Sequence, residues 1–234
     1  MGLSRMLIPL EKHNKLTKVL SILKDKCKET AHNGTQVSTF MSKRRKNMVY
    51  KLTPNGIGYF HCFSGATHND FMTDICRMDG FFQRIEKIVY VDKYTFLYTQ
   101  KRVKKLTLKN SKSTYVALSV LILIYAMIYF DRVATDIGKH NLATYKNNVV
   151  LFDVQGVRTL IESKKIRLVK HTLEALNVCR YKNNVNITNQ FYENRDLALS
   201  QLGVIIMDIY KSTNFKEIEG KIILVKLKQL QLIN

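Results

Sequence analysis

The chain has 234 residues, 46% of them hydrophobic, and carries a formal net charge of +20. The apolar content and the two prolines exclude a mostly disordered chain, and four scattered cysteines exclude the disulfide framework of a small secreted domain. The positive charge favours phosphate-rich partners, either nucleic acid or anionic lipid, without choosing between them. We therefore expect a folded, helix-rich α+β protein with a basic surface.

The first predicted region, residues 1–112, holds most of the excess positive charge. Apolar residues recur at helical spacing from Leu10 to Cys27, which predicts an amphipathic helix with a basic opposite face. A cluster of bases follows, which fits a nuclear localisation signal, a contact with phosphate or lipid headgroups, or a solvated loop. Its members are Lys43, Arg44, Arg45 and Lys46.

The pattern then changes to a period of two between Met48 and Phe63. The Asn-Gly pair at residues 55–56 lies between apolar runs, so the pattern predicts a small antiparallel hairpin. A helix is expected at residues 68–77. The β-branched and aromatic runs at 88–91 and 94–98 fit either strands or a continuing helix.

The densest set of reactive side chains lies within residues 61–76. Nitrogen and sulfur are the donors that zinc prefers, so these side chains are candidate zinc ligands, although their spacing is not that of a known zinc finger. A Cys62 nucleophile with His68 as base is a second interpretation, and small buried thiols with structurally bonded histidines are a third. No catalytic residue is assigned, and zinc is the one candidate cofactor. The candidate ligands are His61, Cys62, His68 and Cys76.

The uncharged segment Ser113 to Phe130 forms the second predicted region. As a helix it reaches about 27 Å, near the thickness of a hydrocarbon core, so it predicts a single membrane span. A buried core helix is the alternative. The residues expected in the membrane are Tyr115, Leu118, Leu121, Ile122, Leu123, Ile124, Ile128, Tyr129 and Phe130. The bases that precede the segment, and would face lipid headgroups on the positive side, include Lys101, Arg102, Lys104 and Lys105.

The third predicted region, residues 131–234, is helical or mixed. Its patterns predict a short strand at 149–154, a helix at 157–178 and an amphipathic helix at 195–210. The stretch at 218–233 fits a strand or a helix.

Two windows, residues 61–70 (HCFSGATHND) and 94–100, together with the hydrophobic segment past the middle, resemble a conserved core protein of baculoviruses and nudiviruses. The resemblance implies a late protein of large DNA viruses of arthropods that acts in nucleocapsid envelopment. It also implies an association with the host cell nucleus, the nuclear membrane and the virion envelope. It implies no enzymatic activity.

The sequence thus predicts a membrane-associated viral assembly protein. Its expected partners are a membrane with anionic lipid and viral nucleocapsid proteins, and its basic N-terminal side would be cytosolic or nucleoplasmic. A soluble protein that binds nucleic acid through non-specific phosphate contacts is the first alternative. A zinc or thiol enzyme using residues 61–76 is the second.

Overall fold

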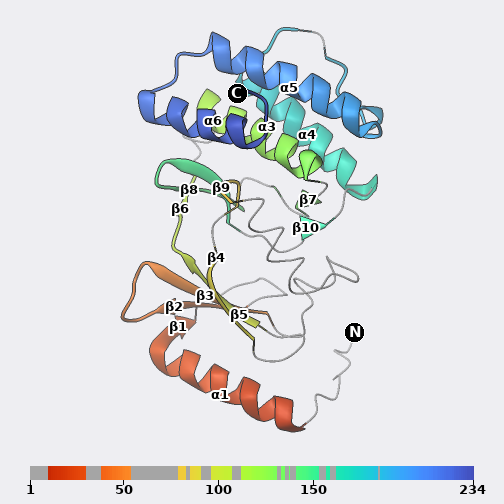
Figure 1. Ribbon diagram of the computed structural model, residues 1–234. Coiled ribbons are helices and arrows are strands. Elements are labelled where there is room, and N and C mark those ends of the chain that lie inside the picture. The colour runs from red at the N-terminus through yellow and green to blue at the C-terminus, as the bar shows by residue number, and fades with distance from the viewer. Residues whose placement is uncertain are drawn as a thin grey trace. The chain divides into compact units, whose positions relative to one another are not determined.

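The computed structural model in Figure 1 has a mixed α+β fold, as the composition predicts. The structure describes residues 10–29, 38–53, 79–82, 85–90, 96–106, 112–130, 133–134, 137, 141–152, 157–158, 162–183 and 185–234. The chain divides into two compact units. Unit 1 comprises residues 1–64 and 84–102, and unit 2 comprises residues 65–83 and 103–234.

The described residues of unit 1 form an antiparallel sheet with one helix. The sheet has five strands in the order β1-β2-β3-β5-β4. Helix α1 supplies Leu23 to a small apolar core that also contains Cys27, Phe40 and Leu52. The elements are α1 (Leu10–Lys26), β1 (Cys27–Glu29), β2 (Ser38–Ser42), β3 (Met48–Thr53), β4 (Ile85–Tyr90) and β5 (Phe96–Lys101).

The structure confirms the amphipathic helix at the start of the chain. The described parts of the runs at 88–91 and 94–98 are strands, since residues 88–90 belong to β4 and residues 96–98 to β5. Strand β3 begins where the alternating pattern begins, and it pairs with β2 and β5. The turn that joins β2 to β3 contains the predicted basic cluster, whose four side chains are exposed. The second half of the hairpin predicted at 48–63 and the helix predicted at 68–77 lie outside the described residues.

The described residues of unit 2 form four helices and two small sheets. Its helices are α3 (Thr114–Tyr129), α4 (Glu162–Val178), α5 (Arg195–Ser212) and α6 (Glu217–Gln229), with a short 3-10 turn at Gln190–Tyr192. The three-stranded sheet contains β6 (Lys104–Lys105), β8 (Leu142–Tyr145) and β9 (Asn148–Leu151), in the order β6-β8-β9. The two-stranded sheet pairs β7 (Val133–Ala134) with β10 (Val157–Arg158). The stretch at 218–233, left open by its pattern, is mainly helical.

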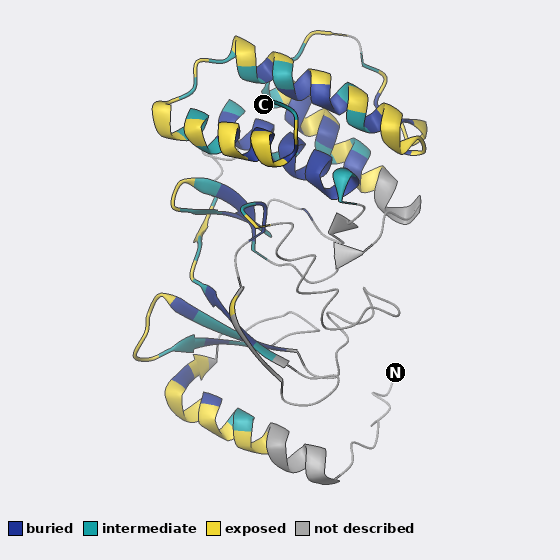
Figure 2. Ribbon diagram, in the orientation of Figure 1, coloured by how far each residue is buried: buried dark blue, intermediate teal, exposed yellow. Residues whose placement is uncertain are grey.

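Helix α3 is the core of unit 2 rather than a membrane span. Its residues from Tyr115 to Ile128 are buried apart from Val120, which is half-buried, and Figure 2 shows the helix buried along its length. Helices α4, α5 and α6 pack against it. None of the described helices combines the length and the hydropathy that a bilayer crossing requires. The predicted single span is therefore wrong, and the uncharged segment is buried by protein instead of lipid.

Both ends of α3 are fixed by polar contacts. Ser113 caps the helix, since its Oγ accepts a hydrogen bond from the backbone N–H of Val116 at 3.3 Å. At the other end, Arg195 of α5 donates from Nε to the carbonyl of Ile128 at 3.1 Å and from Nη2 to that of Tyr129 at 2.7 Å. The arginine satisfies two carbonyls that the last turn of a helix leaves without a partner.

We expect Leu121→Ala to lower the free energy of unfolding by about 2–5 kcal/mol, because it leaves a cavity in a fully buried position. The matched control is Val204→Ala on α5, where the side chain is 58% exposed and the expected change is below about 0.5 kcal/mol. Urea unfolding followed by far-UV circular dichroism measures both. Equal effects of the two substitutions would show that α3 is not the core.

Candidate functional site

Several hydrogen bonds anchor the β8–β9 hairpin in the described part of unit 2. Its two strands pair from Leu142↔Leu151 to Tyr145↔Asn148. The two turn residues, Lys146 (φ 49°) and Asn147 (φ 65°), both have positive φ. Positive φ at both central positions is the requirement of the type I′ turn that suits a twisted two-residue hairpin.

The hairpin is held from several sides. Tyr115 of α3 donates from its hydroxyl to the carbonyl of Asn147 at 2.7 Å. Asn148 donates from Nδ2 to the carbonyl of Gly80 at 2.8 Å, and the backbone N–H of Leu151 donates to the carbonyl of Phe81 at 3.0 Å. These bonds fix β9 against residues 79–82 and fix the turn against the core helix.

Lys226 of α6 adds a contact from inside the core. Its Nζ donates to the carbonyl of Val149 at 2.9 Å and lies 5.5 Å from the centre of the Phe81 ring. The side chain is only 4% exposed, and burial lowers the pKa of Lys226 from 10.5 to about 7. One helix thus reaches both β9 and residues 79–82, because Gln229 of the same helix donates to the carbonyl of Asp79 at 3.1 Å.

The open end of the hairpin brings two chain segments together. The backbone N–H of Phe152 donates to the carbonyl of Asn141 at 3.0 Å, which continues the β8–β9 pairing by one step. Further out, β7 pairs with β10, with Ala134 opposite Val157 and Val133 opposite Arg158. These contacts join residue 152 to residue 141 and residues 133–134 to residues 157–158. Of the residues between, the structure describes only Ile137, which is buried.

These segments carry a sequence signal that the sequence analysis missed. Asp136 and Asn141 stand in the spacing Asp-x-x-x-x-Asn, and Asp153 follows β9 with a glycine at 156. The catalytic loop of protein kinases has this Asp-to-Asn spacing, and the kinase Asp-Phe-Gly motif supplies a further carboxylate. The signal is weak alone, because Asp and Asn five positions apart are common. It gains weight from the backbone pairs on either side of it.

In unit 1, strand β3 contains a buried lysine. Lys51 is 7% exposed, stands opposite Tyr98 of β5 in the sheet register, and lies 5.9 Å from the centre of that ring. It is the fourth residue of Met48-Val49-Tyr50-Lys51, and the third strand of a protein-kinase sheet carries its phosphate-binding lysine after a similar apolar run.

The residues predicted from sequence fall elsewhere. His61, Cys62, His68 and Cys76 lie outside the described residues. Within the described ranges, no three His, Cys, Asp or Glu side chains gather closely enough to hold a metal ion. The predicted headgroup bases Arg102, Lys104 and Lys105 are exposed, and Lys101 is half-buried on β5. The predicted membrane residues all belong to α3 or its C-terminal cap.

The described cysteines give no sign of thiol chemistry. Burial raises the pKa of the Cys27 thiol, and it raises the pKa of Cys179 to about 11. A thiol with a raised pKa is protonated at neutral pH and is a poor nucleophile.

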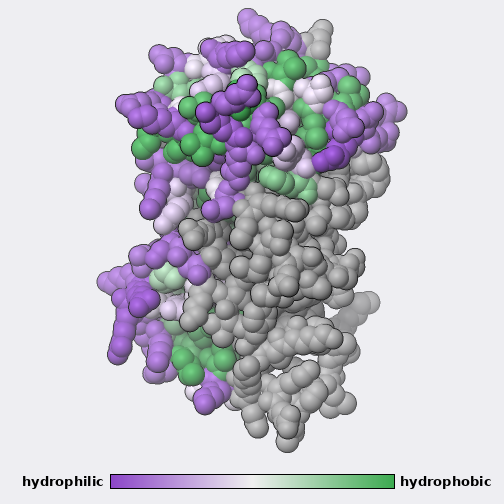
Figure 3. Space-filling view, viewed as in Figure 1, coloured by the Kyte–Doolittle hydropathy of each residue, from purple (hydrophilic) through white to green (hydrophobic). Residues whose placement is uncertain are grey.

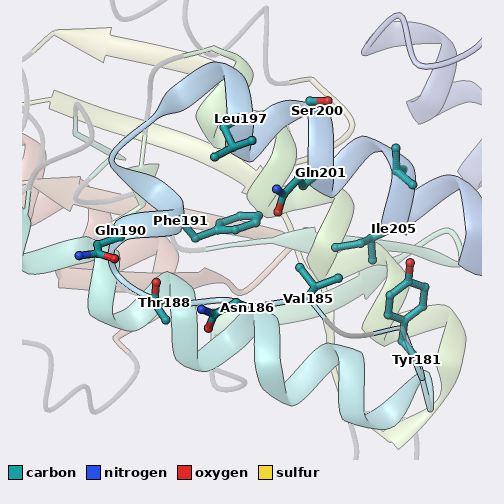
Figure 4. A pocket seen from close by; sticks show the side chains of 11 residues that line it. Tyr181, Val185, Asn186, Thr188, Gln190, Phe191, Leu197, Ser200, Gln201 and Ile205 are labelled. Atoms are coloured by element: carbon teal, nitrogen blue, oxygen red, sulfur yellow. The ribbon is translucent and has the colours of Figure 1, made fainter.

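A groove of about 470 Å³ lies between α5 and the preceding segment 181–191 (Figure 4). In Figure 4, Phe191 lies in the middle of the groove, with Gln190 and Tyr181 at opposite ends. Its lining is apolar and amide side chains without a charged group, so it suits binding better than acid–base chemistry. The Tyr181 hydroxyl donates to Asp208 Oδ2 at 3.0 Å and accepts from Asn183 Nδ2 at 3.2 Å.

No family model matches the chain, and neither does any curated protein. Among solved structures, the chain is similar to the kinase PK-1 of Cydia pomonella granulovirus, with 13% identity over 94% of this chain and 92% of that one and a TM-score of 0.42. It is also similar to the Legionella pneumophila kinase Lpg2603, solved bound to IP6, with 14% identity over 88% of this chain and 81% of that one and a TM-score of 0.44.

These findings correct the function predicted from sequence. The prediction of a membrane-associated assembly protein is wrong, because the segment expected to anchor it is a buried core helix. The expectation of no enzymatic activity stands against two neighbours that are both named as kinases. Neither neighbour bears on the resemblance to the baculovirus and nudivirus core protein, which stays a prediction.

We expect the stability of the chain to depend on pH through Lys226. The pKa of this lysine is about 7 in the folded chain and 10.5 as the ordinary value, so between these pH values the unfolded chain binds the additional proton. Stability should therefore rise with pH across this window, by up to about 1.4 kcal/mol per pH unit, and below the window Lys226 should add no pH dependence. Urea unfolding at about pH 7, 8, 9 and 10, which spans this window, measures the slope.

Lys226→Met should remove this part of the slope. Lys228→Met, at an exposed position on the same helix, should leave it unchanged. If the wild type and Lys226→Met show the same slope, the lysine is not buried as a neutral amine.

Proposed function

We propose that this chain is a phosphotransferase of the protein-kinase type, which transfers the γ-phosphoryl group of ATP to a hydroxyl acceptor. The observation that carries the proposal is the pair of backbone ties around the hairpin's open end. Phe152 bonds to Asn141, and Ala134 pairs with Val157. In the sequence, Asp136 lies between Ala134 and Asn141, and Asp153 lies between Phe152 and Val157.

In this proposal Asp136 is the catalytic base. The hydroxyl oxygen of the acceptor attacks the γ-phosphorus, the bond from that phosphorus to the β–γ bridging oxygen breaks, and ADP leaves. The proton of the hydroxyl passes to the carboxylate of Asp136. The next residue in the chain, Ile137, is buried.

Asn141 and Asp153 are the residues that would hold Mg²⁺. Amide and carboxylate oxygens are the protein ligands that this ion accepts. The hydrogen bond between Phe152 and Asn141 supports the fit, because it places the residue that precedes Asp153 in the chain beside Asn141. A bound Mg²⁺ would neutralise the charge that develops on the phosphates.

The sequence departs from the kinase pattern at three points. Ala134 and Thr135 stand where kinases have His and Arg before the catalytic Asp, and Val154 stands where they have Phe. The glycine after Asp153 comes at position 156, one residue later than in the Asp-Phe-Gly motif. The departures concern residues that position the loop, whereas the three oxygen-bearing side chains needed for transfer are present.

We expect Asp136→Asn to lower phosphoryl transfer by about 100-fold or more, since it removes a general base, while binding of Mg·ATP is retained. Transfer is measured from γ-labelled ATP to the chain itself and to a random serine, threonine and tyrosine peptide library. Binding is measured from the rise in melting temperature with Mg·ATP. The matched control is Asp196→Asn, whose side chain is 93% exposed. A wild-type chain that neither binds Mg·ATP nor transfers phosphate would overturn the proposal, and so would equal activity of the two variants.

A further inference from the structure

Unit 1 contains a second feature that phosphoryl transfer does not use. A cavity of about 530 Å³ opens between α1 and the edge of the sheet. Its apolar lining comes from residues that pack only partly into the unit 1 core, namely Val19, Tyr50 and Leu97, together with Ile22, which is 45% exposed. Aliphatic and aromatic side chains are thus left facing a concave space.

The rim of this cavity is strongly basic. Lys26, Lys43, Arg44 and Arg45 line it, against a single acid, Asp25. Figure 3 shows hydrophobic surface in this unit bordered by hydrophilic side chains. A cavity in which an apolar floor meets a rim of one charge selects a ligand that has both an apolar part and the opposite charge.

The rim is built into the fold. The backbone N–H of Lys43 donates to the carbonyl of Lys26 at 3.1 Å, and its Nζ donates to the carbonyl of Asp25 at 2.7 Å. Ser42 Oγ accepts from the backbone N–H of Arg45 at 2.9 Å, which shapes the turn. The C-terminus of α1 and the β2–β3 turn are therefore joined by hydrogen bonds, and the bases are presented from a fixed backbone.

We propose that this cavity, lined by Val19, Ile22, Leu23, Tyr50 and Leu97 and rimmed by Lys26, Lys43, Arg44 and Arg45, is a docking site for an acidic, amphipathic peptide segment of a partner protein. An apolar side chain of that segment fills the cavity, and its carboxylates meet the basic rim. The floor favours a peptide over a nucleic acid backbone, because phosphates need the bases but have no use for an aliphatic cavity. The concave floor, of about the size of a small-ligand site, favours one inserted side chain over a flat lipid surface.

The test is a selection of phage-displayed random peptides on the full chain, followed by affinity measurement with fluorescein-labelled copies of the enriched peptides. We expect enrichment of peptides that combine Asp or Glu with Leu, Ile or Phe. We expect at least tenfold weaker binding to Arg44→Glu/Arg45→Glu and to Ile22→Glu, because the first reverses the rim charge and the second places a charge in the floor. Both substitutions are at exposed positions, and circular dichroism checks that each variant is folded.

Lys104→Glu/Lys105→Glu is the matched control, with the same change in net charge at exposed positions of unit 2, and it should bind as the wild type does. The proposal is overturned if no acidic peptide is enriched, or if replacing the apolar residues of the enriched peptides by alanine leaves their affinity unchanged. It is also overturned if the control variant loses as much peptide affinity as the rim variant. It is also overturned if phosphatidylserine vesicles bind the rim and the peptides do not. Phosphoryl transfer does not enter any of these readouts, so the docking site and the proposed activity stand or fall separately.

Discussion

An uncharged helix has to be removed from water, and the architecture of unit 2 follows from that constraint. Helix α3 has almost no polar face, so a single neighbour could not bury it. Three helices pack around it, and its two ends are satisfied by Ser113 and by Arg195. The β8–β9 hairpin depends on this helix too, because Tyr115 in its first turn bonds to the carbonyl of Asn147 in the hairpin turn. A helix that is held by apolar burial thus also fixes a polar turn.

The same property explains why the sequence misleads about membranes. Lipid tails and protein interiors are equally apolar, so the composition of residues 113–130 predicts burial without saying what buries them. Tertiary contacts distinguish the two environments. Helices α4, α5 and α6 pack against the segment, and Arg195 bonds to carbonyls at the C-terminal end of α3. The basic flank favours a membrane by the positive-inside rule, but in this chain part of it forms β5 and β6. Helix positions at α1, α5 and α3 were predictable, because each depends on periodicity or hydropathy over many residues.

The candidate site was harder to predict for a different reason. Its pieces are short: β7 and β10 have two residues each, and β8 and β9 have four. Strands of this length carry little periodicity, and the β8–β9 turn uses Lys146-Asn147 in place of the Asn-Gly pair that signals such a turn most clearly. Asp136, Asn141 and Asp153 are ordinary surface residue types, so nothing in composition distinguishes them. The contacts that flank them in the sequence, Phe152 with Asn141 and β7 with β10, join segments that are distant along the chain. Pairing between distant segments cannot be predicted from a local pattern.

The roles of individual charged residues are also hard to predict from the sequence. In a chain with 38 lysines and arginines, the number of basic residues says little about any one of them. Among the described residues, Lys51 and Lys226 are nearly inaccessible to solvent. Lys51 lies near the ring of Tyr98 in the sheet, whereas Lys226 bonds to a carbonyl of the hairpin and lies near the ring of Phe81. Burying a cation is unfavourable unless a partner compensates, so each of these positions must be stabilised by its surroundings or by a ligand. The exposed bases of the β2–β3 turn keep their water and need no such compensation. They contribute a local positive potential, and its effect on binding depends on the charge of the partner.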